Sequence, residues 1–214
     1  GLGDVYKRQP FTGLNNLDIS SPFFLGAQNC YFKDYGAYTG EISLNMLLEC
    51  NVEYVIVGHS ERRHMFSEDN NLINKKVCKI IKSGIKSILC LGETSDQRNA
   101  GLTYNIIEEQ LISGLSNIKT LSNIIIAYEP VWAIGTGLTA SSKQINEVHK
   151  FIKKILSQLF DHEDYNATPI LYGGSVNLAN ASEIISMDSV NGFLIGGASL
   201  DVVKFSEIIK IVNS

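Results

Sequence analysis

The sequence predicts an α/β protein whose core is a parallel sheet with helices on its outer side. Short β-branched runs alternate with longer amphipathic runs from residue 10 onward, in six strand–helix units. Units of about 23 to 43 residues are typical of parallel strands joined by right-handed helical crossovers. This alternation fits both a doubly wound sheet and an eight-stranded barrel. No linker-like stretch divides the 214 residues, which indicates one domain.

The predicted strands are short apolar runs that end in polar or glycine-rich segments. Residues 1–9 have neither strand nor helix periodicity and look unlike the rest of the chain. The run Ile124 to Ile126 is β-branched throughout, as is typical of a strand buried on both faces. The predicted strands cover residues 23–28, 54–58, 86–91, 124–128, 169–172 and 192–195.

The predicted helices carry apolar residues at helical spacing. One stripe runs from Leu72 to Ile81 and should stop at Gly84, a residue that favours the left-handed cap conformation. Another, over residues 145–159, follows Ser141, which with Gln144 forms a capping box. Further stripes cover residues 102–118, 181–185 and 202–212. Taken alone, these stripes indicate core packing and no function.

Composition excludes several classes of protein. Eighteen basic and 22 acidic residues leave a net charge of −4, so neither nucleic acid nor an anionic membrane is an expected partner. No apolar run is long enough for a spanning helix, and no signal peptide is recognisable. The cysteines have no metal-binding or paired spacing, which indicates reduced thiols and a cytoplasmic protein. They are Cys30, Cys50, Cys78 and Cys90.

Candidate functional residues follow the ends of the predicted strands, where parallel α/β folds place their sites. Glu129 follows a buried strand, and Pro130 after it keeps Glu129 out of helical geometry. The segment then turns at Gly135-Thr136-Gly137. This pattern suggests a general base beneath a moving lid. An ordinary loop carboxylate at a strand end is the alternative interpretation.

A histidine and two glycine pairs follow other strands. His59 stands just before a predicted helix with Ser60 as a candidate cap, and the helix dipole there disfavours a protonated imidazole. Gly173-Gly174 and Gly196-Gly197 follow the last two strands. Their backbone N–H groups suit the binding of a phosphate, although each pair alone is more often a tight turn.

Seven segments together resemble one family. A-Q-N at 27–29, G-A-Y-T-G-E-I-S at 36–43, V-I-V-G-H-S-E-R-R at 55–63, C-L-G-E at 90–93, A-Y-E-P-V-W-A-I-G-T-G at 127–137, Y-G-G-S at 172–175 and G-F-L-I-G-G-A-S-L at 192–200 resemble triosephosphate isomerase. The resemblance covers about residues 10–214 in the family's order. It implies a (β/α)8 TIM barrel, a homodimer, a phosphorylated triose substrate, and neither metal nor organic cofactor.

The resemblance also implies a role for each matching residue. Glu129 would be the base that moves a proton between the two carbons, and neutral His59 would polarise the carbonyl. A neutral histidine and a closing lid are established for the triosephosphate isomerases themselves and come to this chain through the resemblance. Glu61 and Tyr172 would support the site and the closed lid, and Thr39 would reach the partner subunit. The implied phosphate ligands are Gly135, Ser175, Gly196 and Gly197.

One motif of the family is missing. The family's first strand ends in Asn-x-Lys, and its lysine offsets the charge of the substrate, but this sequence contains no such motif. Pro10-Phe11 resembles the residues just after the family's second strand. We therefore expect a partial barrel domain at 10–214 that lacks the first strand, the first helix and a recognisable second strand, with residues 1–9 a foreign or artefactual segment.

Two alternatives to an active isomerase remain. A catalytically crippled remnant of the family would keep the motifs but lose activity with the lysine. A barrel aldolase would need a Schiff-base lysine or metal ligands at the strand ends. Lys86 stands at the start of its predicted strand, which places the aldolase last.

Overall fold

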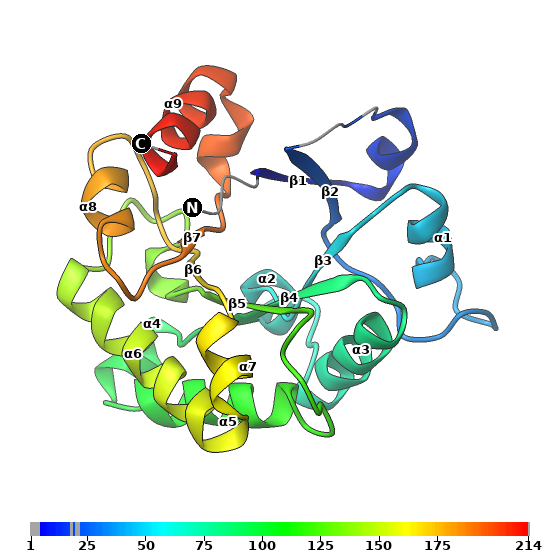
Figure 1. Ribbon diagram of the computed structural model, residues 1–214, viewed down its shortest axis with the longest axis horizontal. Helices are drawn as coiled ribbons and strands as arrows, with labels where there is room; N and C mark the ends of the chain where they lie inside the picture. Colours follow the sequence, from blue (N-terminus) through cyan, green and yellow to red (C-terminus); the bar gives the residue numbers. More distant parts are fainter. Residues whose placement is uncertain (1–4, 18, 20–21, 214) are drawn as a thin grey trace.

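A curled, seven-stranded parallel sheet forms the centre of the molecule, and helices surround it (Figure 1). The computed structural model describes residues 5–17, 19 and 22–213. The strands pair in chain order, each with the next. They are β1 (Val5–Gln9), β2 (Phe23–Ala27), β3 (Tyr54–Val57), β4 (Lys86–Leu91), β5 (Ile124–Tyr128), β6 (Ile170–Tyr172) and β7 (Gly192–Phe193).

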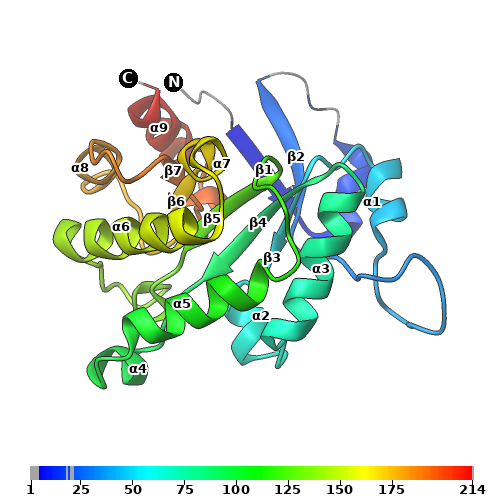
Figure 2. The same ribbon diagram turned by 60° about the horizontal axis from the view of Figure 1, so that its bottom comes forward.

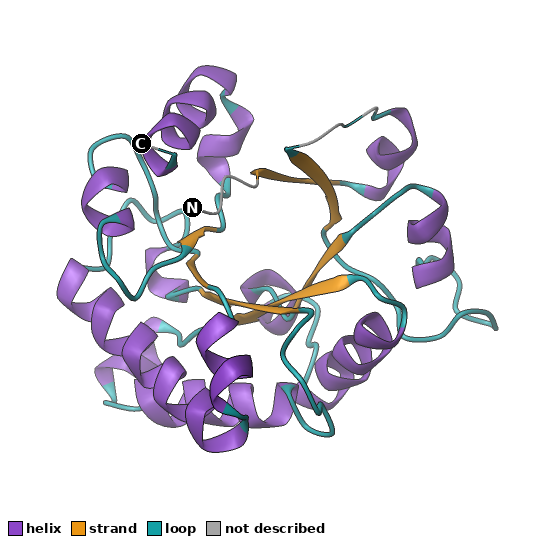
Figure 3. Ribbon diagram, viewed as in Figure 1, coloured by secondary structure: helices purple, strands orange, loops and turns teal. Residues whose placement is uncertain are grey.

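Helices follow the strands on the outer side of the sheet, as the alternation predicts (Figure 3). Helices α3, α5 and α6 lie side by side against the outer face of the sheet (Figure 2). The α-helices are α1 (Leu44–Glu49), α2 (Ser60–His64), α3 (Asn70–Lys82), α4 (Ser95–Asn99), α5 (Thr103–Gly114), α6 (Ser142–Leu159), α7 (His162–Ala167), α8 (Ala181–Ile185) and α9 (Val202–Val212). Short 3-10 turns form η1 (Phe11–Asn16), η2 (Val131–Ala133) and η3 (Gly197–Leu200).

Strands β3, β4, β5 and β6 are buried on both faces over nearly their whole length, which explains their continuous apolar runs. Successive side chains alternate between two clusters because the side chains of a strand point to opposite faces. Ile124 and Ile126 face the helices, whereas Ile125 faces the inside of the curled sheet. The inner cluster comprises Tyr54, Ile56, Ile88, Cys90, Ile125, Ala127, Leu171 and Leu194. The carboxyl ends of all the strands therefore surround one small region.

Residues 5–9 correct one expectation. The prediction that the first nine residues hold no strand was wrong, because β1 pairs in parallel with β2 from Val5↔Phe23 to Gln9↔Ala27. Strand pairing uses backbone groups, which no side-chain periodicity reports, and Val5 and Tyr6 are residue types that favour strands. The segment 1–4 lies outside the described residues. Whether residues 1–9 are foreign stays a prediction.

The sheet has two free edges in the part of the chain that is described. No ladder joins β7 to β1 there, so the sheet stays open between its first and last strands (Figure 3).

The helix expected over residues 102–118 is shorter and ends at Gly114. Helix α3 ends at Lys82, and Gly84 follows with a φ of +82°, as predicted. The capping box of Ser141 and Gln144 is present at α6. None of the described helices is long and apolar enough to cross a membrane.

Candidate active site

The ends of β3 and β5 bring a histidine and a carboxylate into contact. Glu129 directly follows β5, and its residue is only 2% exposed. Its Oε1 lies 3.1 Å from Nε2 of His59, the residue that precedes α2. Its Oε2 accepts a hydrogen bond of 3.1 Å from the backbone N–H of Ser60. The base and electrophile candidates from sequence thus occupy one site, although 70 residues separate them in the chain.

The hydrogen bonds of His59 assign the protons of its ring. The N–H of Glu61 donates to Nδ1 over 3.3 Å, so Nδ1 carries no proton and Nε2–H donates to Glu129. His59, not the predicted Ser60, is therefore the N-cap of α2. Burial lowers the pKa of His59, but the hydrogen bond and charge of Glu129 outweigh burial and raise the pKa above its ordinary value. The predicted preference for a neutral ring is thus opposed while Glu129 is in contact.

A cavity of about 680 Å³ opens in front of this pair. Most of the residues predicted for the site line it, from the ends of β3, β5, β6 and β7. Arg62 is the one cation among the described residues that line it, and its Nε is paired with Glu68 at 2.6 Å. The lining includes His59, Glu61, Glu129, Gly135, Gly173, Gly174, Ser175, Gly196 and Gly197.

The two glycine pairs follow the paired strands β6 and β7, and both pairs line the cavity. Gly196 is the N-cap of η3, and Gly197 is its first residue. Within the described part of the chain, the N–H groups of these two residues donate to no protein acceptor. Unpaired amides at the start of a helical turn carry partial positive charge and suit an anion. Ser175 and the exposed Gly135 complete this side of the cavity.

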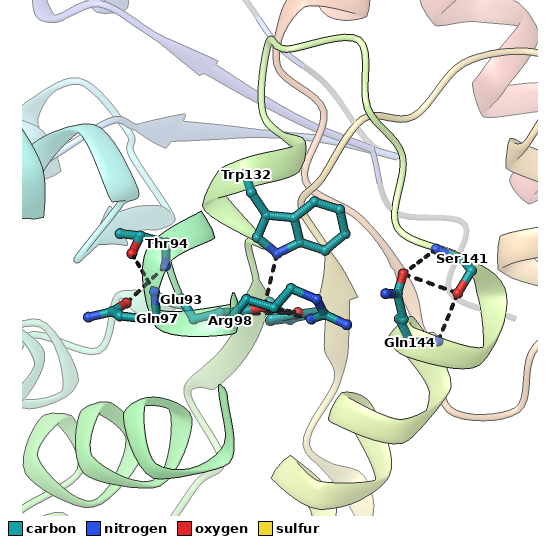
Figure 4. Close-up of polar contacts among 8 residues, drawn as sticks. Glu93, Thr94, Gln97, Arg98, Trp132, Ser141 and Gln144 are labelled. Carbon is teal, nitrogen blue, oxygen red and sulfur yellow. Dashed lines mark hydrogen bonds and ion pairs between the residues drawn. The ribbon is translucent and has the colours of Figure 1, made fainter. Parts of the chain in front are cut away.

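The segment after Glu129 is anchored by a buried carboxylate (Figure 4). Glu93 has a fully buried side chain and accepts hydrogen bonds from Trp132 Nε1 at 3.0 Å and from Tyr128 Oη at 3.1 Å. Arg98 Nη1 pairs with the same carboxylate at 2.8 Å, and its guanidinium lies over the Trp132 ring. These contacts fix η2, whereas residues 135–139 beyond it are exposed. The segment therefore has a fixed start and an exposed tip.

Tyr172 and Thr39 lie away from the cavity wall. The Tyr172 side chain is buried beneath Gly174, and its hydroxyl has no hydrogen-bond partner among the described residues. Burial raises the pKa of Tyr172 to about 12, and the nearby backbone N–H of Ala140, which does not reach hydrogen-bond geometry with the hydroxyl, lowers it. Thr39 is exposed on the loop between Tyr31 and Ser43, which a bridge closes at its base. The structure thus places Tyr172 near the end of the exposed segment and Thr39 outside the site.

Two buried polar residues near the site, Lys76 and Glu93, received no role from the sequence. Lys76 is only 1% exposed, and its Nζ contacts Glu68 at 2.5 Å and Asn29 at 2.8 Å. Lys76 lies on the buried face of α3, between Ile73 and Ile80. A lysine at an otherwise apolar helix position was the one feature of the sequence that could have pointed to it. Glu93 was inside a recognised motif but had no assigned role. Lys86, considered for a Schiff base, lies at the start of β4 and contacts Tyr54 Oη at 3.0 Å.

Comparison with known proteins agrees with this geometry. The profile of the family "Triosephosphate isomerase" matches residues 8–212. A triosephosphate isomerase of Chlorobium phaeobacteroides is 47% identical over 209 residues, covering 97% of this chain and 84% of the relative. Those of Thermodesulfovibrio yellowstonii and Aquifex aeolicus are 48% and 50% identical, covering 90% and 86% of this chain and 78% and 75% of the relatives. The chain belongs to the triosephosphate isomerase family.

Proposed function

We propose that this isomerase interconverts dihydroxyacetone phosphate and glyceraldehyde 3-phosphate by proton transfer through an enediolate. The contact between Glu129 Oε1 and His59 Nε2, at the wall of a cavity with two glycine pairs, is the observation that carries the proposal. A buried carboxylate and a neutral N–H donor are the two groups that proton abstraction next to a carbonyl needs. The family assignment supports the same reaction.

Glu129, His59 and Glu61 have separate roles in the proposed reaction. Glu129 takes a proton from the carbon beside the carbonyl and returns it to the neighbouring carbon. His59 Nε2–H donates to the carbonyl oxygen and stabilises the negative charge that develops there. It then gives its Nε2 proton to that oxygen and takes the proton of the neighbouring hydroxyl oxygen, so that the enediolate is protonated on the oxygen that was the carbonyl. Glu61 supports this arrangement because its backbone N–H keeps Nδ1 unprotonated. Substrate must separate Glu129 from His59, since both groups use these atoms to contact each other in the empty site.

The phosphate group binds opposite the base. The amides of Gly196 and Gly197, together with Ser175, are its ligands, and Gly135 joins them when the exposed segment closes over the cavity. Tyr172 then holds the closed segment through its hydroxyl, which has no partner in the described part of the structure. Closure excludes water, which strengthens each electrostatic contact and protects the enediolate.

We also propose a barrel architecture and a dimeric assembly for this protein. The curled sheet is part of a (β/α)8 TIM barrel that lacks the family's first strand and first helix, and the open edge between β7 and β1 supports this. The protein is a cytoplasmic homodimer in which the Thr39 loop reaches the partner subunit. The exposed Tyr35 and Met46 near that loop support such an interface.

A crippled remnant is the second candidate function. It is favoured by the absence of Asn-x-Lys from the sequence and by the pairing of Arg62 with Glu68, which leaves the described lining of the cavity without an uncommitted cation. The loss of one preorganised electrostatic group lowers an enzyme's rate by about 10²–10³-fold. The two candidates therefore differ in rate and not in the type of reaction.

One experiment tests both candidates. Isomerisation is measured for this chain and for a version extended by the first strand and first helix of a relative. Solubility, dimer formation and kcat are expected to rise together in the extended version. Full native activity of the unextended chain would refute the account of the missing lysine. Absence of activity from the extended version, with the fold intact, would refute the proposed reaction.

A further inference from the structure

Strands β3 and β4 separate from each other close to the site. They pair as far as Val57↔Leu89, after which Gly58 turns away with a φ of +70° and leads to His59. Strand β4 continues to Leu91 and then to Gly92. The backbone groups of β4 beyond Leu89 therefore lose β3 as a partner. Buried backbone groups of this kind need replacement hydrogen bonds.

Two side chains supply these replacement bonds. Arg63 bridges the parting strands, since its Nε donates to Gly58 O at 2.8 Å and its Nη2 to Cys90 O at 3.0 Å. Gln110 reaches across from α5 to Gly92. Its Oε1 accepts from Gly92 N at 2.8 Å, and its Nε2 donates to Gly92 O at 3.1 Å. A primary amide presents one donor and one acceptor side by side, so Gln110 pairs with Gly92 as a neighbouring strand would.

The position of Gly92 is coupled to the position of the catalytic base. A Cβ added at Gly92 would lie 1.8 Å from Glu129 O, so the two backbones touch. The N–H of Glu129 also donates to Leu91 O at 2.7 Å. A shift of Gly92 therefore shifts the backbone of Glu129. Gln110 is buried and lies outside the lining of the cavity, and both hydrogen bonds of its amide group go to Gly92.

We propose that Gln110 is a positioning residue for the isomerisation, which holds Gly92 and through it the base Glu129. This inference rests on the proposed function. Gln110 contributes no atom to substrate binding, so its loss should change kcat and leave KM nearly constant. A misplacement of about 1 Å in a catalytic group can lower the rate by about 10²-fold. A smaller shift of Glu129 is expected here, with a fall in kcat of about 10-fold or more.

The first test uses Gln110→Met with Ile107→Val as the matched control. Gln110→Met keeps the length of the side chain and removes both hydrogen bonds to Gly92. Ile107 lies on the same helix and is fully buried without polar contacts, so Ile107→Val disturbs the core of α5 alone. We expect kcat to fall about 10-fold or more in Gln110→Met, with KM within about 3-fold, and to stay within about 2-fold in Ile107→Val.

The second test uses Gln110→Glu, which keeps the shape and makes one hydrogen bond depend on pH. The introduced carboxylate still accepts from the N–H of Gly92 but repels its carbonyl oxygen. Protonation restores a donor, and burial raises the pKa of the introduced carboxyl. The kcat of Gln110→Glu relative to wild type should therefore increase as the pH falls from 8 to 6. A merely structural defect would give a ratio that does not change with pH.

Hydrogen exchange separates this inference from the proposed function. The amides of Gly92 and Glu129 should exchange at least about 10-fold faster in Gln110→Met than in Ile107→Val. If wild type does not isomerise the triose phosphates, the proposed function fails, and exchange alone decides whether Gln110 holds these two residues. If Gln110→Met keeps kcat within 2-fold of wild type, or if the two amides exchange as in the control, the inference is wrong.

Discussion

Gly173 lies against the side chain of Glu129, the proposed base, so a single methyl group at position 173 should displace that side chain. A Cβ added at Gly173 would lie 2.8 Å from Glu129 Cγ and 3.3 Å from Tyr128 O. The φ of Gly173 is not in the left-handed region, so its φ does not disfavour alanine. Gly173→Ala therefore perturbs the position of Glu129 more than the fold.

The size of the displacement follows from the contact distance. Ordinary van der Waals contact of a Cβ begins at 3.4 Å, so Glu129 Cγ must move by about 3.4 − 2.8 = 0.6 Å. That shift is more than half of the 1 Å misplacement that lowers rates by about 10²-fold, so we expect kcat to fall about 10-fold or more. The shift also weakens the contact of Glu129 with His59 Nε2.

The assay is a steady-state measurement of isomerisation in both directions, with a thermal melt of each variant. Gly114→Ala is the control, because its Cβ would meet Leu89 Cδ2 at 3.0 Å, a similarly close contact with a side chain away from the site. Gly114→Ala should keep kcat within about 2-fold. If Gly173→Ala retains full kcat, or if both variants lose activity in parallel with stability, the geometric argument for Glu129 fails.

Three further predictions concern buried polar groups. Trp132→Phe removes one hydrogen bond from Glu93, which keeps two other donors, so the free energy of unfolding in urea should fall by about 1–2 kcal/mol. Lys76→Met leaves buried Glu68 with Arg62 alone and should cost about 3 kcal/mol, whereas Lys76→Met with Glu68→Leu should recover part of that loss. Burial lowers the pKa of His149 to about 4, so the unfolded chain takes up a proton first as the pH falls from about 6.5 to 4. Stability should therefore decrease across that window by at most about 3 kcal/mol, and urea denaturation should show a flatter pH profile for His149→Asn.

The strands were the part of the fold most easily predicted from sequence. Two of them, residues 86–91 and 124–128, have the predicted bounds, and β2 and β3 differ by a single residue at one end. These strands are buried on both faces, so their composition alone marks them. Strand β1 could not be found in this way, because its pairing depends on the backbone of β2. The short helices α1, α4 and α7 were missed because so few residues show no reliable apolar period.

The site was predicted less evenly than the sheet. Residues that follow strand ends could be chosen from sequence, and the structure places His59, Glu129 and Ser175 around one cavity. The residues that hold these groups could not be chosen, since Gln110 and Arg63 read as ordinary polar positions on helices. They contact Gly92, Gly58 and Cys90, which lie on other segments of the chain. Local sequence patterns do not report which distant segments meet in the fold.

The raised pKa of His59 and the neutral ring that the reaction needs are consistent once the empty and occupied sites are distinguished. Burial lowers the pKa of His59, and contact with Glu129 raises it. A substrate that separates the two removes the contact but leaves the burial, so the pKa falls as the ring turns to the carbonyl oxygen. The N–H of Glu61 donates to Nδ1 without involving Glu129, so we expect this hydrogen bond to persist with substrate bound and the remaining proton to be on Nε2, where the proposed reaction places the carbonyl. In the empty site, His59 therefore already has its proton on Nε2, which is the tautomer that the proposed reaction needs.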